Sequence, residues 1–210
     1  MADTAALAPF LDVFPDWLRT LGDDARELGD SLDEGSDEAT SRYTVGGLNY
    51  IFKSLDLIPD GIDDLGFCDD AFVIRVAARL ALSIPEPERE PVTEPEPETP
   101  ADAADAEAPA EVAPPIAKEP SAVLVRLAGE ASHVEAFLGA DYELLVTYVN
   151  GLRKGAARGR TVDDILGDEA ARTSFLQEVK AWAADYQVPA FTRDVKTLIK
   201  LKAFLSAKLG

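Results

Sequence analysis

Apolar side chains in the first 82 residues recur at steps of three and four, the spacing that places them on one face of an α-helix. The pattern predicts a helix that begins at Pro15, because proline suits the first turn, and continues to residue 32. Two more helices are predicted over residues 38–53 and 69–82. Since each glycine destabilises a helix by about 1 kcal/mol relative to alanine, we expect the Gly46-Gly47 pair to admit another helix at close range.

The same periodicity returns after residue 120 and predicts four further helices. Neither part of the chain shows a convincing alternation of apolar and polar residues, which would be typical of a β-strand. The sequence therefore predicts an all-α protein. The apolar stripes of the later helices lie within residues 124–138, 144–152, 175–186 and 195–205.

Proline, glutamate and alanine dominate the segment between the two helical parts, residues 86–120, which has almost no large apolar side chains. Such a segment cannot bury enough apolar surface to offset the entropy lost on ordering. We therefore expect a disordered acidic linker here. It would join an N-terminal helical domain, residues 1–85, to a C-terminal helical bundle, residues 121–210.

Charge changes the picture of possible partners. The 210 residues carry 20 Lys and Arg against 39 Asp and Glu, a net charge of −19. This balance argues against nucleic-acid binding, which needs a basic surface. The acidity is uneven, because residues 1–90 carry 7 basic and 20 acidic groups, net −13, whereas residues 121–210 carry 12 and 11, net +1. The charges therefore favour docking between the two helical parts.

We expect a soluble, cytoplasmic protein with no transmembrane segment. The first basic residue is Arg19, so the N-terminus lacks the basic and then apolar order of a signal peptide. The most apolar later stretch, residues 71–84, is interrupted by Arg75 and Arg79 and is shorter than the ~20 apolar residues that span a bilayer. The single cysteine, Cys68, suits a reducing compartment.

A short motif connects the second and third predicted helices. It reads Asp56-Leu57-Ile58-Pro59-Asp60 and, after a spacer, Gly66-Phe67-Cys68-Asp69-Asp70. Over roughly residues 40–82 the chain thereby resembles the YkvA-like family of unknown function, which shares the first core and a Gly-x-x-Asp-Asp helix start. The resemblance implies a helical domain and brings no established catalytic role. The spacer departs from the family's usual apolar one because it holds Asp63 and Asp64.

Each motif residue has a structural interpretation. Pro59 ends a helix, and Asp56 and Asp60 accept hydrogen bonds from backbone donors in the turn. Gly66 allows a positive φ. Asp69 or Asp70 then provides the N-cap of the following helix and complements its dipole.

A divalent-cation site is the alternative interpretation of the motif. Hard cations such as Mg²⁺ and Ca²⁺ prefer oxygen ligands, and the spacing is not that of an EF-hand. A metal-dependent hydrolase would also need a substrate cleft and an activated water. We assign no catalytic residue, metal ligand or cofactor. Carboxylates within the motif and its spacer are those of Asp56, Asp60, Asp63, Asp64, Asp69 and Asp70.

Other reactive side chains are few. The single histidine, His133, is interpreted as a surface residue or one with its hydrogen bonds satisfied, not as a catalytic one, and Cys68 as a half-buried, inert thiol. Trp17 and Trp182 fall on apolar stripes and are expected in the core. A basic stretch at residues 153–160 is interpreted as a solvated loop, or as a contact for an acidic partner or a phosphate.

These observations favour a non-enzymatic protein-interaction module or adaptor with an unidentified protein partner. The tethered layout supports this, because a linker sets the effective concentration of the modules it joins. The cation-dependent activity is the second hypothesis. The third is peripheral membrane association through residues 69–82, which the net charge of −13 on residues 1–90 opposes.

Overall fold

The computed structural model describes most of the chain and confirms the all-α class; its only strands among the described residues are two residues long. The expected linker lies almost wholly outside the described residues. Those described are 4–32, 37–53, 56–59, 61–62, 65–83 and 119–210.

Helices before the undescribed segment follow the predicted stripes closely, with one exception at the N-terminus. The first predicted helix corresponds to α2, which begins at Phe10 and not at Pro15, so the predicted start is wrong. Phe10 and Phe14 are both buried, and their packing extends the helix through the proline although Pro15 has no N–H to donate. The elements are α1 (Thr4–Leu7), α2 (Phe10–Leu32), α3 (Glu38–Tyr50) and α4 (Cys68–Leu82).

The elements after residue 120 include the four predicted helices and several short elements that the apolar pattern did not predict. β1 and β2 form a tight antiparallel hairpin in which Ala156 pairs with Thr161. Thr161 and Asp164 form a capping box at the start of α7, in which each side chain accepts a hydrogen bond from the other residue's backbone N–H. The elements are α5 (Ala122–Leu138), η1 (Gly139–Asp141), α6 (Tyr142–Leu152), β1 (Ala156–Ala157), β2 (Arg160–Thr161), α7 (Val162–Gly167), α8 (Glu169–Asp185) and α9 (Val195–Leu209).

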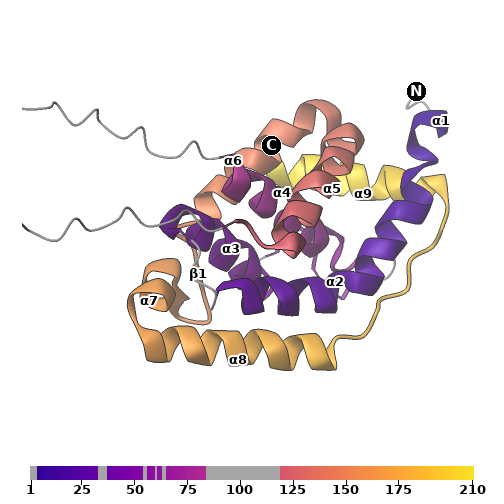
Figure 1. Ribbon diagram of the computed structural model, residues 1–210. Helices are drawn as coiled ribbons and strands as arrows, with labels where there is room; N and C mark the ends of the chain where they lie inside the picture. The colour runs from indigo at the N-terminus through magenta and orange to yellow at the C-terminus, as the bar shows by residue number, and fades with distance from the viewer. Residues whose placement is uncertain (1–3, 33–36, 54–55, 60, 63–64, 84–118) are drawn as a thin grey trace, which may run out of the picture. The chain divides into compact units, whose positions relative to one another are not determined.

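The two helical parts, expected as separate domains, belong to one compact unit made of residues 1–84 and 120–210. The physical reason is α4, which has 12 buried residues among its 15 and is therefore enclosed by other elements on all sides. Helices α2 and α3 cover part of it, and α5 and α6 from the later part of the chain cover the rest (Figure 1). Burial of α4 also means that it offers no free apolar face to a membrane.

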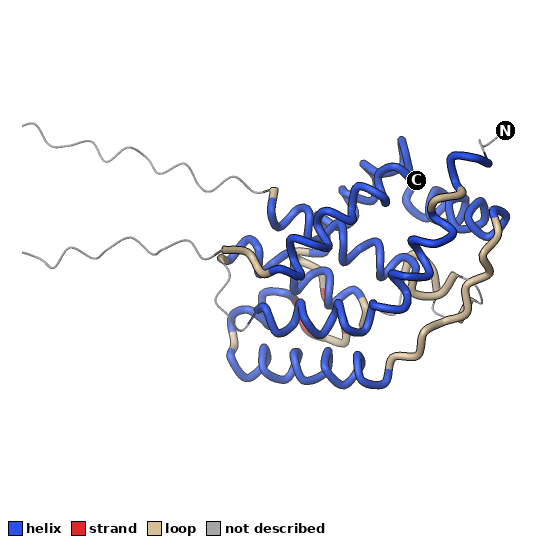
Figure 2. Tube along the Cα trace, turned by 45° about the vertical axis from the view of Figure 1, so that its right-hand side comes forward, coloured by secondary structure: helices blue, strands red, loops and turns tan. Residues whose placement is uncertain are grey.

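Aromatic side chains join the two parts of the chain at the centre of the unit. The ring of Phe14 on α2 lies 4.9 Å from those of both Phe72 on α4 and Phe137 on α5. Phe72 is near the start of α4 and Phe137 near the end of α5, whereas Ala78 and Leu124 line one small hollow at the other ends. The helices α4 and α5 are therefore antiparallel neighbours. Figure 2 shows that helices make up most of the described fold.

The glycine pair in α3 lies where two other helices come closest, which confirms the prediction for Gly46-Gly47. A Cβ on Gly46 would lie 2.9 Å from the carbonyl oxygen of Leu152, the last residue of α6. One on Gly47 would lie 3.0 Å from the Cβ of Ala77 on α4. Because the atom that meets Gly46 is backbone, it has little freedom to move away.

Candidate functional site

The aspartate motif folds around a buried hydrogen-bonded pair, Tyr50 and Asp69. Asp69 lies in the first turn of α4 and is 0% exposed. Its Oδ2 accepts a hydrogen bond from the Tyr50 hydroxyl at 2.5 Å and one from the Ile58 N–H at 2.8 Å. The same hydroxyl accepts from the Leu57 N–H at 2.7 Å. Two side chains thus hold the turn at residues 57–58 between α3 and α4, with Leu57 and Ile58 buried in the core.

Burial raises the pKa of the Tyr50 hydroxyl, and the negative charge of Asp69 raises it further. The hydroxyl is therefore protonated at neutral pH and donates to the carboxylate. Tyr50 was missed by sequence reasoning because it occupies a position in the apolar stripe of α3. Its role could have been predicted from its chemistry, because a buried tyrosine hydroxyl needs a hydrogen-bond partner and the motif supplies a buried carboxylate.

The other motif residues divide between the core and the surface. Asp70 and Gly66 are buried, Asp56 is half-buried and Pro59 is exposed. Asp60 lies outside the described residues, as do Asp63 and Asp64 of the spacer. The motif therefore does not act as one exposed cluster over the part of it that the structure describes.

The predicted N-cap is wrong, because α4 begins at Cys68 and its N-cap is Phe67. Asp69 and Asp70 lie inside the first turn, where their charge still complements the helix dipole. The positive φ expected at Gly66 is found at Phe67, with φ 63°. Packing stabilises that conformation, since the Phe67 ring meets the ring of Tyr186 edge-on at 5.4 Å and that of Trp182 at 6.2 Å. Trp182 itself is only partly buried.

Cys68 is fully buried, not half-buried as expected. Burial raises the pKa of its thiol well above the ordinary value, and the neighbouring charges of Asp69 and Asp70 raise it further. The thiol is therefore protonated at neutral pH, which agrees with its interpretation as unreactive.

A buried ion-pair network joins α2, α4 and α5 beside the motif. Arg75 is 0% exposed and contacts Asp24 at 3.1 Å and Glu130 at 2.7 Å. Asp24 also pairs with Arg126 at 2.7 Å, and the Arg75 guanidinium lies 4.1 Å from the Trp17 ring centre. Desolvation lowers the pKa of Arg75, and the two carboxylates oppose that shift. The sequence showed Arg75 only as an interruption in an apolar run.

The basic stretch at residues 153–160 is used largely within the fold. The guanidinium of Arg153 lies 4.9 Å from the Tyr43 ring centre, and that of Arg158 lies 4.6 Å from the Phe52 ring centre. Arg160 pairs with Glu178 at 2.5 Å. Lys154 is exposed. Outside this stretch, His133 is exposed, as interpreted, and lies edge-on to Trp17.

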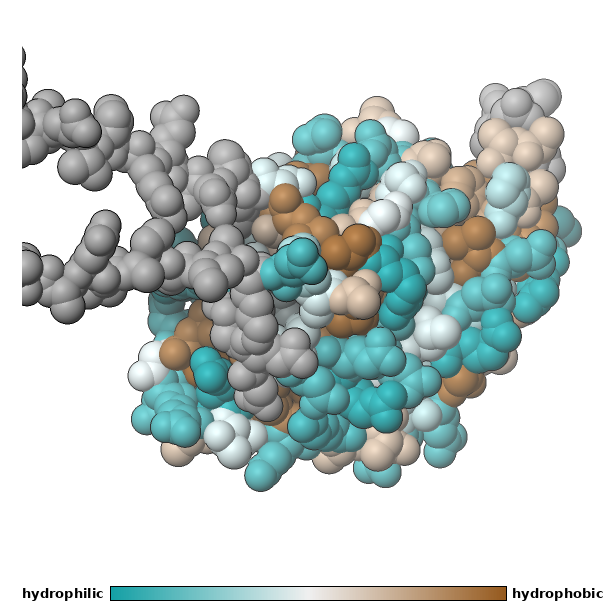
Figure 3. All heavy atoms as spheres, viewed as in Figure 1, coloured by the Kyte–Doolittle hydropathy of each residue, from teal (hydrophilic) through white to brown (hydrophobic). Residues whose placement is uncertain are grey.

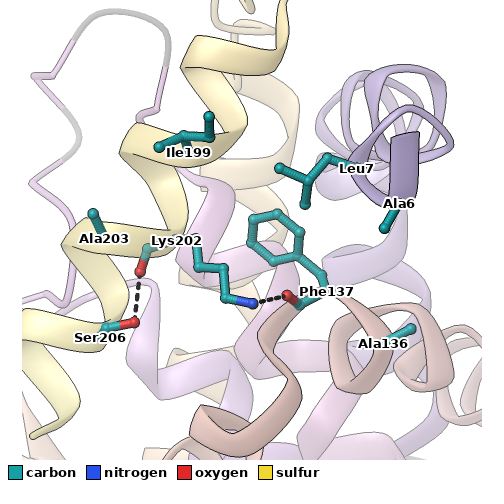
Figure 4. A pocket seen from close by; sticks show the side chains of 8 residues that line it. All are labelled: Ala6, Leu7, Ala136, Phe137, Ile199, Lys202, Ala203 and Ser206. Atoms are coloured by element: carbon teal, nitrogen blue, oxygen red, sulfur yellow. Dashed lines mark hydrogen bonds between the residues drawn. The ribbon is translucent and has the colours of Figure 1, made fainter. Parts of the chain in front are cut away.

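A surface hollow of about 370 Å³ lies between α1, α5 and α9 (Figure 4). The side chains of Leu7, Phe137 and Ile199 turn toward it, and Lys202 crosses its edge. The Lys202 ammonium donates a hydrogen bond to the Phe137 carbonyl at 2.9 Å. The hollow is thus apolar with one cation at its margin. No sequence pattern pointed to it, because its three walls are distant in the chain. It is lined by Ala6, Leu7, Ala136, Phe137, Ile199, Lys202, Ala203 and Ser206.

No match for the chain is found among protein-family models, curated proteins or solved structures. Within the described ranges, no three Asp, Glu, His or Cys side chains are grouped so that they could hold a metal ion. The cation-site alternative stays a prediction, because half of the motif's six carboxylates lie outside those ranges. None of the described helices combines the length and the apolar character required to cross a bilayer.

Proposed function

We propose that the chain is a non-enzymatic protein-interaction module of the YkvA-like type, and that it binds its partner through α9. Two features of the motif support a structural role for its buried aspartate. Asp69 is enclosed in the core, and both it and Tyr50 are bonded to the turn between α3 and α4. The motif then stabilises a scaffold, and binding falls to a surface elsewhere.

The observation that carries the proposal is the charge on α9. This helix has four lysines and no acidic residue, in a chain of net charge −19. Among the described residues, none of the four lysines forms an ion pair, whereas arginines on α2, α3, α4 and α5 all do. Positive charge that the fold leaves uncompensated is available to a partner of opposite charge. The lysines are Lys196, Lys200, Lys202 and Lys208.

The face shown in Figure 3 provides a comparison. Hydrophilic side chains cover most of α2 and α8 there, and hydrophobic ones gather in small patches over α5. Small scattered patches are ordinary for a folded surface and need no binding role. The face around α9 differs because an apolar hollow lies beside unpaired lysines.

The test uses the whole chain, because its two helical parts share one core. The chain is immobilised as bait, beside a Lys196→Glu/Lys200→Glu variant and a control with the same charge change elsewhere, Lys154→Glu/Arg172→Glu. We expect proteins retained by the parent and the control to be lost from the α9 variant, as measured by quantitative mass spectrometry. Retention that does not depend on α9, or no retained protein at all, would contradict the proposal.

A further inference from the structure

We infer that the hollow between α1, α5 and α9 binds an acidic peptide segment that inserts one bulky apolar side chain between Leu7, Phe137 and Ile199. This inference rests on the proposed function and specifies the partner's chemistry. An apolar anchor in a pocket, surrounded by a charged rim, is the usual form of a protein–peptide contact.

The walls of the hollow fit an inserted side chain. Phe137 is 1% exposed and Leu7 is 7% exposed, so both are already held by the core and form a fixed floor and wall. Ile199 is 44% exposed, which makes it one of the few large apolar side chains that the fold leaves open to solvent. A partner side chain placed among them would cover Ile199 without rearranging the other two.

The rim of the hollow selects acidic partners. Lys196 and Lys200 lie near Ile199 along α9 and are exposed, outside the set of residues that line the hollow. Lys202 uses one of its three ammonium protons on the Phe137 carbonyl, and two remain for a ligand. The carboxylate of Asp141 accepts a hydrogen bond from Ser206, which lines the hollow two turns after Ile199 on the same face of α9.

The distribution of charge favours α9 as the place where an acidic segment binds. The chain as a whole carries −19, so an acidic segment is repelled by its net charge at long range and attracted locally by the lysines of α9. The same net charge opposes an anionic membrane as the ligand. Proteins that bind a membrane surface do so by inserting their own protruding side chains into the lipid. A hollow has the opposite shape and suits a ligand that inserts a side chain into the protein.

The experiment measures fluorescence anisotropy with labelled 12-residue peptides, rich in Asp and Glu, that carry a central Phe, Leu or Trp. Each is matched by a peptide with Ala at the centre. We expect at least one anchored peptide to bind at least tenfold more tightly than its Ala partner, with affinity falling as salt rises. Two variants of the whole chain should each lose at least tenfold, Lys196→Glu/Lys200→Glu through charge and Ala203→Phe by filling the hollow.

Controls separate the outcomes. Ala184→Phe, at an exposed position on α8, introduces the same side chain elsewhere and should bind as the parent does. Equal affinity for Phe and Ala peptides, or binding that survives Ala203→Phe, overturns the inference. So does binding to phosphatidylserine vesicles that requires the α9 lysines and exceeds binding to every peptide. If peptides fail while α9-dependent protein capture persists, the inference fails and the proposed function stands; if that capture is also absent, both fail.

Discussion

At the scale of single residues, buried polar groups fix the conformation of a turn that apolar packing alone does not specify. Leu57 and Ile58 could be buried in many arrangements of the turn, and the one found also brings both of their N–H groups to Tyr50 and Asp69. Hydrogen bonds of this kind contribute modestly when made and are expensive to leave unmade in the core. Asp69 therefore has a structural role, which is to hold the turn at residues 57–58 in place.

Replacing Tyr50 with phenylalanine should reduce the free energy of unfolding by about 1–3 kcal/mol, because the Leu57 N–H and the Asp69 carboxylate each lose a buried partner. Tyr148→Phe is the matched control, since that half-buried hydroxyl accepts a hydrogen bond from the Lys53 side chain, and its loss should cost below about 1 kcal/mol. Urea unfolding measures both. Equal losses would mean that the Tyr50 hydroxyl has no special role.

Arg75→Met should destabilise the protein by about 3–5 kcal/mol, because it leaves Asp24 in the core with only Arg126 for charge compensation. Arg79→Met is a control one turn later on the same helix. Its pair with Glu135 on α5 is largely exposed, and the loss should be below about 1 kcal/mol. A small effect of Arg75→Met would indicate that methionine packing compensates for the lost pair, and chemical denaturation distinguishes these results.

At the scale of elements, apolar periodicity was sufficient to locate the long helices, although it placed the start of α2 at Pro15 and not at Phe10. It predicted 38–53 and 69–82 where α3 and α4 span Glu38–Tyr50 and Cys68–Leu82. It could not find β1, β2 or α7, because two to six residues are too few for a period to appear. It also could not pair Asp24 with Arg75, since the contact joins residues 51 positions apart and depends on the packing of whole helices. The hollow at α9 was hidden for the same reason.

Two glycines should respond in opposite ways to alanine. Gly46→Ala should destabilise the protein even though alanine favours helix, because the new Cβ meets the Leu152 carbonyl at 2.9 Å. Gly129→Ala on α5 places its Cβ in open space and should stabilise by up to about 1 kcal/mol. Thermal melting of the two variants beside the parent tests the contrast. Stabilisation by Gly46→Ala would show that α6 can move away from α3.

At the scale of the whole molecule, the acidic segment interrupts one folded unit and does not separate two. Helices α4 and α5 are antiparallel, so α4 ends and α5 begins at the same end of the helix pair. A connection at that place has no need of great length. The compositional change near residue 85 was a good guide to where the segment begins, but it could not show that the flanking helices share a core.

Replacing residues 86–117 with twelve Gly and Ser residues should therefore preserve the fold. Twelve residues can extend to roughly 40 Å, enough to rejoin neighbouring helices. Far-UV circular dichroism and the urea midpoint should remain close to those of the parent, and closure of a shorter loop slightly favours the folded state. Loss of the cooperative transition would mean that the segment contributes to the core.

The shared core also determines what survives a break in the backbone. Each piece left by cleavage within residues 84–118 would carry only part of the apolar surface, because α4 belongs to the first and its cover α5 and α6 to the second. Neither piece can bury that surface alone, and together they can. An intact backbone is thus not needed at this position. The two halves, produced as separate polypeptides, should associate and form the native fold.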